Sequence, residues 1–403
     1  MNSLELFSGV GGLAKGLELS GFKHTALVEF NKHAYASLCE NFDSQKVFLS
    51  DVRTFNLDAL SDIDLVAGGP PCQPFSLGGK HQADRDGRDM FPWAIHAIEQ
   101  LRPKVFVFEN VKGLLRQTFS DYFEYIILRL TYPAFSVDAQ LDWRCHLNEL
   151  RSMSQLSYTG TKYNVQFKLI NAADYGVPQL RERVVIVGIR SDIKKVWSFP
   201  QETHSVDRLF WDMHVTGEYW DRHGISKSER PLMDKPLKDK VSRLTEKYGM
   251  FQPPARPWQT LRDAIGLIPD PRSDHNIQDH VFRDGARIYP GHTGSMLDAP
   301  AKTIKAGDHG VPGGENMIRF PDGRVRYLTV FEAKRLQTFP DNYMIKGSWG
   351  EAMRQIGNAV PVLLAETIGH GLMRCIESKS SACLSSRRLS PSRIGEDVAG
   401  LRG

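Results

Sequence analysis

Strand-like and helix-like segments alternate along the first third of the chain, and this order limits the folds open to it more than any other feature. Short apolar runs are separated by stretches with helical spacing, which is typical of a doubly wound α/β sheet. We therefore predict a Rossmann-like α/β domain. The expected strands are residues 3–7, 25–29, 46–49, 63–67 and 104–108, and the expected helices are residues 12–20, 32–41 and 91–101.

The loop between the first strand and the first helix is rich in glycine. Residues 7–13 read FSGVGGL, and glycine at this place lets the backbone turn tightly and approach a ligand. The pattern is FxGxGG rather than GxGxxG, and it lacks the lysine and hydroxyl residue of a P-loop. A pyrophosphate ligand is therefore disfavoured, which leaves the helix N-terminus to face a carboxylate.

Two acidic residues end the next two strands. Glu29 closes the second strand, where an acidic side chain accepts the hydroxyls of a ribose. Asp51 closes the third strand, where a carboxylate can accept a hydrogen bond from an adenine amino group. Each alone is as readily an ordinary surface carboxylate, but together with the glycine loop they predict a nucleoside pocket.

Cys72 has a setting that favours covalent chemistry. It follows Pro70 and Pro71, whose rings fix φ at about −65° and remove two backbone donors. We interpret Cys72 as a nucleophile, and the competing interpretation is a small buried apolar residue. The chain has no CxxC pair, so neither a disulfide framework nor a zinc site is indicated, and a reducing compartment is expected. The five cysteines are Cys39, Cys72, Cys145, Cys375 and Cys383.

The composition is that of an ordinary globular protein. The chain has 403 residues, a length that allows two domains. Of these residues 41% are hydrophobic and 24% are charged. The N-terminus does not resemble a secretion signal, and no apolar run has the length of a membrane span. The net charge of +4 mildly favours a polyanionic partner.

A series of sequence blocks resembles the DNA (cytosine-5) methyltransferases of the bacterial restriction-modification type. The blocks cover roughly residues 1–190 and 320–375 and occur in the order of that family. They are the FxGxGG loop, Glu29, Asp51, GGPPCQPFS at 68–76, ENV at 109–111, QLRER at 179–183, RYLT at 326–329, Glu332, RLQTFP at 335–340 and QIGNAVP at 355–361.

The resemblance implies S-adenosylmethionine as the methyl donor and a covalent route. Carbon 5 of cytosine is too weak a nucleophile to take a methyl group unaided, and a Cys72 thiolate that adds to carbon 6 turns the base into an enamine. Glu109 would supply a proton or hydrogen bond at ring nitrogen 3. Arg183 would approach the carbonyl oxygen of the base, and Arg181 would lie near the sulfur and the backbone.

Ordinary alternatives exist for these side chains. Glu109 could be a helix cap or a surface carboxylate, and either arginine could form a plain salt bridge with Glu182 or an aspartate. Period-two geometry predicts that Arg181 and Arg183 share one face of their strand.

The resemblance also assigns a cofactor pocket and DNA contacts. No metal is expected, because His275, His280, His292 and His309 match no ligand set, and we predict polar surface or DNA contacts for them. The expected cofactor-binding residues are Phe7, Ser8, Gly9, Gly11, Gly12, Leu13, Glu29, Phe30, Asp51, Val52, Pro71, Asn358 and Ala359. The expected DNA contacts are Ser76, Arg88, Thr303 and Ile304.

A target carbon inside duplex DNA is shielded by stacking, so the nucleotide must swing out into the protein. This predicts a second, smaller lobe that holds the DNA. We expect a catalytic domain at 1–190, completed by 324–376, and a target-recognition domain at 191–323, where alternation fades and Pro, Trp, His and charged residues accumulate. Residues 377–403 form a Ser/Arg-rich tail that we expect to be disordered.

The expected partner is double-stranded DNA, and a monomer in the bacterial cytoplasm without membrane contact is expected. A cognate restriction endonuclease could share the site without binding the chain. Three rivals stay open: a transfer-RNA methyltransferase, disfavoured by the large second lobe and the lack of a Cys-Phe-Thr tripeptide; a non-catalytic DNA-binding protein; and a nicotinamide-dependent oxidoreductase, which leaves PPCQ at 70–73 unexplained. The recognised base sequence is not predicted.

Overall fold

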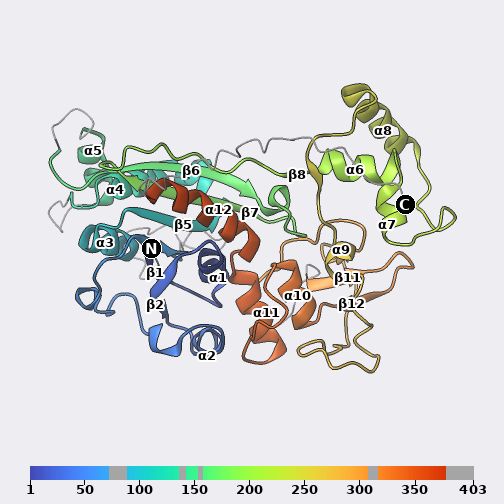
Figure 1. Ribbon diagram of the computed structural model, residues 1–403, viewed down its shortest axis with the longest axis horizontal. Coiled ribbons are helices and arrows are strands. Elements are labelled where there is room, and N and C mark those ends of the chain that lie inside the picture. Colours follow the sequence, from blue (N-terminus) through green and yellow to red (C-terminus); the bar gives the residue numbers. More distant parts are fainter. Residues whose placement is uncertain (72–88, 136–141, 153–157, 307–315, 378–403) are drawn as a thin grey trace, which may run out of the picture.

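The protein has two lobes that lie side by side (Figure 1). The structure is a computed structural model, and it describes residues 1–71, 89–135, 142–152, 158–306 and 316–377. One lobe holds the N-terminal part of the chain and the C-terminal helix, and the other holds most of residues 204–327. The tail predicted to be disordered lies outside the described residues from 378 onward.

The first lobe is built on a seven-stranded sheet of order β3-β2-β1-β4-β5-β7-β6. The first five strands in chain order run parallel, whereas β7 runs antiparallel to both β5 and β6. The predicted α/β sheet is confirmed, but the antiparallel β6–β7 edge was not predicted. The strands are β1 (Asn2–Leu6), β2 (Lys23–Glu29), β3 (Val47–Leu49), β4 (Leu65–Gly68), β5 (Val105–Val111), β6 (Tyr163–Asn171) and β7 (Glu182–Arg190).

Helices cover both faces of this sheet, because its central strands are apolar on both sides. On one face α3 (Phe91–Leu101) and α4 (Ser120–Thr131) pack on β1, β4 and β5. On the other face α1 (Gly12–Leu19) packs against α12 (Val362–Ile376). The last helix of the described chain thus packs against the first. The sheet edge at β3 is covered by α2 (Lys32–Asn41), and α5 (Trp143–Ser152) lies on α4.

The second lobe has few regular elements. Its small separate core contains Leu209, Met213, Tyr219 and Trp220, and long irregular segments connect short helices and strands. Its elements are β8 (His204–Ser205), α6 (Val206–His214), α7 (Glu218–Arg222), α8 (Lys235–Tyr248), β9 (Arg256–Pro257), α9 (Leu261–Ile265), β10 (Ser295–Met296), β11 (Met317–Arg319) and β12 (Val325–Tyr327).

One predicted domain boundary does not follow the hydrogen bonds. The boundary expected after residue 323 falls between β11 and β12, which pair antiparallel with Ile318 opposite Arg326. Because the two strands share backbone hydrogen bonds, they form one hairpin. We therefore assign both strands to the second lobe.

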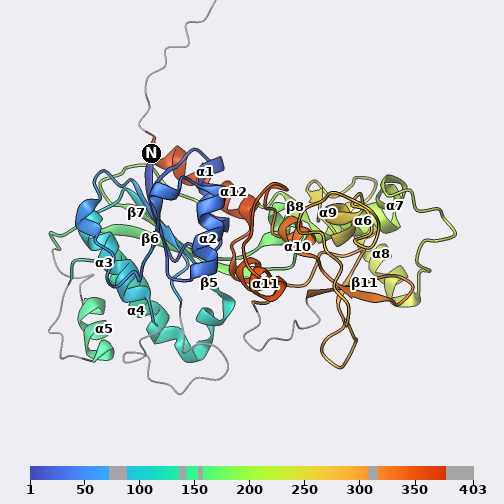
Figure 2. The same ribbon diagram turned by 90° about the horizontal axis from the view of Figure 1, so that it is seen from below.

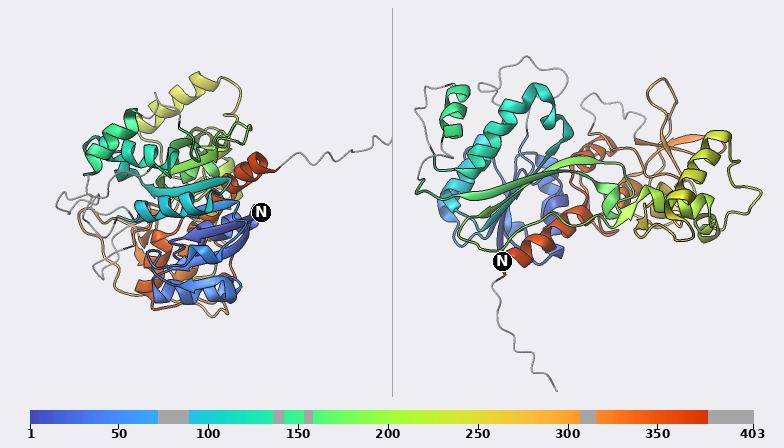
Figure 3. Two further views of the ribbon diagram at one scale, coloured as in Figure 1. Left: turned by 90° about the vertical axis from the view of Figure 1, so that its left-hand side faces the viewer. Right: turned by 90° about the horizontal axis from the view of Figure 1, so that it is seen from above.

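Two helices lie between the lobes and join them. α10 (Val330–Leu336) and α11 (Trp349–Asn358) occupy the middle of the molecule in the views from below and from above (Figure 2, Figure 3). Their core includes Val10 from the first lobe and Ile318 from the second. The lobes therefore share one continuous apolar core at their junction.

The stretch Trp349–Ile376 has the length and hydropathy of a membrane span. However, 67% of its apolar window is buried inside the described part of the protein, and it consists of two helices, α11 and α12. This is the behaviour of core helices.

Candidate active site

The predicted site residues converge at one edge of the large sheet. Because β1, β2, β4 and β5 run parallel, the segments that follow them meet at the carboxyl end of the sheet, where ligands bind in open α/β folds. The glycine loop follows β1, Glu29 ends β2, Pro70 and Pro71 follow β4, and Glu109 lies near the end of β5.

The glycine loop makes a tight turn with residues in the left-handed region. Phe7 has φ 56°, Gly9 has φ 54° and Gly11 has φ 83°, and the Ser8 N–H donates to the Val28 carbonyl at 3.1 Å. A Cβ added at Gly9 would meet no atom within 4 Å, so the backbone there faces open space. Gly9 is thus the position of this loop that a ligand can approach closely.

Gly12 serves packing instead of ligand approach. A Cβ at Gly12 would lie 2.2 Å from the Val360 carbonyl oxygen, because the segment before α12 presses on the start of α1. This packing explains why position 12 has no side chain, and the expected cofactor contact of Gly12 stays a prediction. Ser8, Leu13 and Ala359 are likewise buried, and Leu13 and Ala359 belong to two different apolar clusters.

Glu29 is held beside the glycine loop by backbone donors. Its carboxylate accepts the Gly9 N–H at 2.7 Å and the Asn31 N–H at 2.6 Å. Burial raises the pKa of the Glu29 carboxyl, although these hydrogen bonds oppose the shift. The carboxylate keeps lone-pair capacity for a further donor such as a hydroxyl group.

Asp51, expected to bind the adenine of the cofactor, forms an ion pair with Arg53. Arg53 Nη2 lies 2.5 Å from Asp51 Oδ2, and this side-chain hydrogen bond lowers the pKa of Asp51. Nearby, the Phe30 ring is 74% exposed, and Val52 lines a cavity of about 200 Å³ between β1 and α3. An acceptor, an exposed ring and a small cavity thus lie at the ends of the neighbouring strands β2 and β3, where the Ser50 N–H donates to the Glu29 carbonyl at 3.1 Å.

Glu109 and Arg183 form a nearly buried ion pair. Arg183 Nε lies 2.6 Å from Glu109 Oε1, and the two side chains are 12% and 11% exposed. The antiparallel register places Arg183 opposite Val111, two residues beyond Glu109. A Cβ added at Gly69 would lie 3.5 Å from Glu109 Oε2, so this carboxylate lies beside the backbone that leads to Cys72.

That backbone is fixed by two hydrogen bonds. Asn110 Nδ2 donates to the Pro70 carbonyl at 2.9 Å, and the Met90 N–H donates to the Pro71 carbonyl at 3.0 Å. The two prolines therefore occupy a defined position next to Glu109. The expected residues Cys72, Ser76 and Arg88 lie outside the described residues, so their positions stay predictions.

Arg181 lies deeper than the sequence suggested. Its guanidinium is completely buried and donates to the carbonyls of Gly357 and Ala359, each at 2.8 Å, and of Ile304 at 3.4 Å. Burial lowers the pKa of Arg181. The alternative salt bridge with Glu182 is wrong, because Glu182 pairs with Lys112 at 2.9 Å.

The two expected DNA contacts of the second lobe lie against the same buried arginine segment. Thr303 Oγ1 donates to the Leu180 carbonyl at 2.6 Å. Ile304 is 1% exposed, and its N–H donates to Gln179 Oε1 at 3.0 Å. The assignment of Ile304 as a DNA contact is therefore corrected: its side chain packs in the core between the lobes.

Two residues that support the site were not singled out from the sequence. Tyr343 donates its hydroxyl to the Val10 carbonyl of the glycine loop at 2.6 Å, and the buried Gln179 donates to the Leu336 carbonyl at 3.3 Å. Gln179 opens the QLRER block, which was a usable signal. Tyr343 lies 333 residues from Val10, and no local pattern announces such a contact. Asn358 is exposed at the end of α11.

The histidines give no metal site in the described part of the chain. His280, predicted as polar surface or a DNA contact, is completely buried between the Thr329 hydroxyl at 2.9 Å and the Pro269 carbonyl at 2.8 Å. That prediction is wrong for His280, because both nitrogens of its ring form hydrogen bonds inside the fold. His309 lies outside the described residues.

Comparison with known proteins agrees with this geometry. The family model of C-5 cytosine-specific DNA methylases matches residues 1–141 and 146–374. The chain is 28% identical over 384 residues to the type II methyltransferase M.NgoMIV of Neisseria gonorrhoeae, which covers 94% of this chain and 99% of that protein. It is 31% identical over 380 residues to M.AplI of Arthrospira platensis, covering 94% and 87%.

A solved structure shows the same fold at lower identity. The crystal structure of the S. pombe Dnmt2 methyltransferase matches with a TM-score of 0.56 and 16% identity, covering 94% of this chain and all of that one. From the family match and the converging strand ends, the chain belongs to the C-5 cytosine-specific DNA methylases, the S-adenosylmethionine-dependent enzymes that methylate carbon 5 of cytosine in DNA.

Proposed function

We propose that the enzyme methylates one cytosine, flipped out of a specific double-stranded DNA sequence, through a covalent adduct with Cys72. The observation that carries this proposal is the Glu109–Arg183 ion pair beside Pro70 and Pro71. This pair places the carboxyl group of Glu109 and the guanidinium of Arg183 beside the segment that directly precedes Cys72. A simple DNA-binding platform has no need of such a pair.

The residues divide the chemistry among them. The Cys72 thiolate adds to carbon 6 of the cytosine, and electrons move toward ring nitrogen 3, where the Glu109 carboxyl donates a proton or hydrogen bond. Arg183 holds the Glu109 carboxylate in place and offers its remaining donors to the carbonyl oxygen of the base. Once carbon 5 has taken the methyl group, water removes the carbon-5 proton, and the electrons of that C–H bond form the 5,6 double bond. The C6–S bond breaks to release the Cys72 thiolate, and the proton on nitrogen 3 returns to Glu109.

S-adenosylmethionine supplies the electrophilic methyl group. The residues at the sheet edge fit it: Glu29 offers free lone pairs to ribose hydroxyls, Phe30 offers an exposed ring, and Gly9 leaves open space for close approach. Asp51 can accept a hydrogen bond from the adenine amino group while it stays paired with Arg53. These groups would hold the cofactor at the mouth of the site.

Arg181 acts as a positioning residue in this scheme. It is completely buried and bonded to three carbonyls, so it does not reach the base. Its neighbour two positions along the strand, Arg183, does face Glu109. We therefore assign Arg181 the task of holding the start of β7 against both lobes.

The biological setting follows from the relatives. Type II methyltransferases are among the most similar proteins, which supports a restriction-modification role with an endonuclease that shares the target sequence. We propose that this enzyme acts in the bacterial cytoplasm as a monomer, without a stable complex with that endonuclease. The second lobe would hold the duplex, and Thr303 would lie near its backbone.

The test is methyl transfer in vitro and in cells. Purified protein is incubated with tritiated S-adenosylmethionine and either duplex DNA or transfer RNA, and DNA from an expressing host that lacks cytosine methylation is sequenced after bisulfite treatment. We expect label in duplex DNA alone and methylation at one recurring sequence. Label in transfer RNA alone would support the rival substrate, and binding without label would support a non-catalytic protein.

A further inference from the structure

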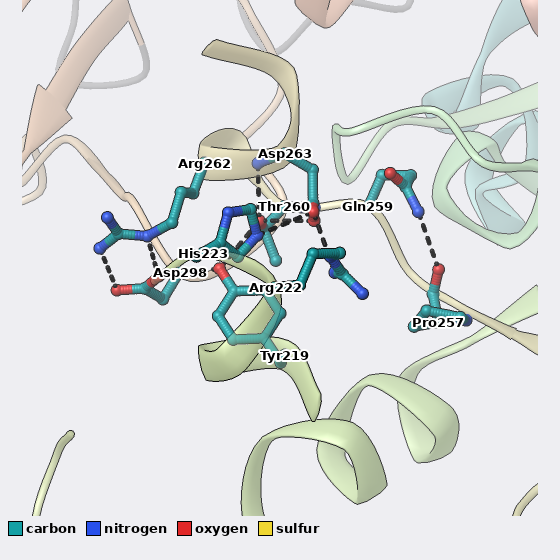
Figure 4. Close-up of polar contacts among 9 residues, drawn as sticks. All are labelled: Tyr219, Arg222, His223, Pro257, Gln259, Thr260, Arg262, Asp263 and Asp298. Atoms are coloured by element: carbon teal, nitrogen blue, oxygen red, sulfur yellow. Dashed lines mark hydrogen bonds and ion pairs between the residues drawn. The ribbon is translucent and has the colours of Figure 1, made fainter. Parts of the chain in front are cut away.

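The loop between α9 and β10, residues 266–294, is the longest connection in the described part of the second lobe. Its base is tied by a polar network that joins α7, α9 and the segment after β10 (Figure 4). Arg262 Nε lies 2.5 Å from Asp298 Oδ1, and the Leu261 N–H donates to the Ala299 carbonyl at 2.8 Å. Tyr219 donates to Asp298 at 2.8 Å. The two ends of the loop are therefore held together.

The middle of the loop is anchored to the helices between the lobes. Lys334, which is 2% exposed, lies 3.5 Å from Asp279, and the buried His280 contacts Thr329. The guanidinium of Arg283 lies 4.3 Å from the centre of the Trp349 ring, a cation–π distance. These contacts make the loop a rigid support up to residue 283.

The tip of the loop, residues 287–292, is a tight hairpin. Tyr289 and His292 exchange two backbone hydrogen bonds, at 3.3 and 2.8 Å, and their rings lie with centres 4.3 Å apart and planes tilted by 38°. Gly291, between them, has φ 82°. Residues 287–291 are all exposed, and in the described part of the chain Arg287 makes no hydrogen bond or ion pair. The tip therefore has a defined shape and unoccupied donors.

The loop projects from the second lobe toward the side that the catalytic edge faces. In the views from below and from above, it leaves the lobe on the side opposite the N-terminus, which is also the side toward which β1 runs from its start (Figure 2, Figure 3). A duplex that places a base at Glu109 would pass between the lobes on that side.

We infer that this tip reads base edges in the target sequence, with Arg287 and Tyr289 as specificity-determining residues. The inference rests on the proposed function. A guanidinium fork matches the two acceptors of guanine in the major groove, and this is the commonest specific contact in protein–DNA complexes. Tyr289 adds one hydroxyl on a ring that packs against His292, and the anchored stem supports both groups. Phosphate contacts would need charge but not this rigidity.

The experiment compares the methylation patterns of full-length variants in a host without cytosine methylation. Arg287→Ala and Tyr289→Phe are tested against Arg324→Ala, which removes an exposed arginine from the turn between β11 and β12, where it pairs with Asp322. Bisulfite sequencing gives the methylated consensus and the ratio of methylation at the cognate site to that at single-base variants. Thermal melting checks that each variant is folded.

We expect Arg287→Ala to lower the discrimination at one base pair by about tenfold or more, Tyr289→Phe to lower it by less, and Arg324→Ala to match the parent enzyme. An unchanged consensus and ratio in Arg287→Ala and Tyr289→Phe would overturn the inference. So would an equal loss of binding to cognate and unrelated duplexes in a filter-binding assay, because that is the behaviour of a phosphate contact. If the parent enzyme methylates nothing, the proposed function fails instead.

Discussion

The catalytic edge and the second lobe position their side chains in different ways. At the edge, Glu109 and Arg183 stand on neighbouring strands of a seven-stranded sheet, so backbone register sets their separation. In the second lobe, residues such as Asp263 and Asp298 hold irregular segments together through side-chain bonds (Figure 4). Register is a property of the fold, whereas such networks can change with the sequence. We therefore expect substitutions in the second lobe to change DNA recognition more readily than substitutions at the edge change the catalytic geometry.

The largest effect is expected at the ion pair of the catalytic edge. Glu109→Gln removes the group that can donate a proton to the ring and leaves the Arg183 charge nearly buried without its partner. The rate of methyl transfer in single turnover should fall roughly 10²- to 10⁴-fold, with little change in S-adenosylmethionine affinity. Glu182→Gln, which removes the exposed partner of Lys112, should change little. A fully active Glu109→Gln enzyme would show that Glu109 takes no part in methyl transfer.

Arg181 tests whether the sheet edge depends on the second lobe. Arg181→Lys keeps the charge but loses the fork that bonds Ile304, Gly357 and Ala359. We expect about 2 to 4 kcal/mol less stability toward urea, together with a lower rate of methyl transfer at saturating substrate. Arg190→Lys, at a partly exposed arginine that pairs with Asp192, is the matched control. Loss of stability with an unchanged rate would show that the edge is independent of the junction.

Asp263 tests the network of the second lobe. It bonds Thr260, Arg222 and His223, and Asp263→Asn should cost about 1 to 2 kcal/mol of stability at pH 7. The affinity for S-adenosylmethionine should stay the same, because the cofactor pocket lies in the other lobe. Asp322→Asn, at an exposed residue, is the control. A loss of S-adenosylmethionine affinity in Asp263→Asn would show that the second lobe affects cofactor binding.

The same residue predicts a pH dependence. Burial favours the neutral acid, but the hydrogen bonds from Thr260 and the charges of Arg222 and His223 outweigh it and hold the pKa of Asp263 below its ordinary value. Its stabilisation is therefore complete above pH of about 4 and is lost as the pH falls through the lowered folded-state pKa. Urea titrations of the parent and Asp263→Asn should differ more at pH 7 than at pH 3. A difference that grows on acidification would contradict this assignment.

The smallest effect is expected at the exposed Arg53–Asp51 pair. Exposed ion pairs contribute little, so Arg53→Ala should change stability by about 0.5 kcal/mol or less. Because the change frees the Asp51 carboxylate, the cofactor affinity measured by calorimetry should be equal or up to about threefold tighter. Lys46→Ala, which removes another exposed pair with Asp43, is the control. A large loss of affinity would mean that Arg53 itself contacts the cofactor.

Much of the catalytic lobe could be predicted because its signals are local. The apolar runs of β1, β2 and β4 and the helical spacing of α2 and α3 gave elements within a few residues of those observed. The positions of Glu29 and Glu109 at strand ends followed from the same alternation, since parallel strands bring their carboxyl ends to one edge. Period two also placed Arg183 on a defined face of β7.

The parts that could not be predicted depend on contacts between distant segments. Arg181 bonds carbonyls 123 to 178 residues away, and Tyr343 bonds Val10 across 333 residues, so burial of these groups has no local signature. His280 looked like a surface residue because its partners Thr329 and Pro269 come from other segments. No local pattern shows that the expected boundary after residue 323 falls inside a hairpin, since only the pairing of β11 with β12 reveals it.

The central claim is that Cys72 joins the base covalently during turnover, and trapping measures this most directly. A duplex that carries 5-fluorocytosine at the target position is incubated with the enzyme and S-adenosylmethionine, and the adduct is mapped by peptide mass spectrometry. We predict one adduct per chain, at Cys72, that requires the cofactor and survives Cys145→Ser, which changes an exposed thiol. No adduct, or an adduct that persists in Cys72→Ser, would contradict the account.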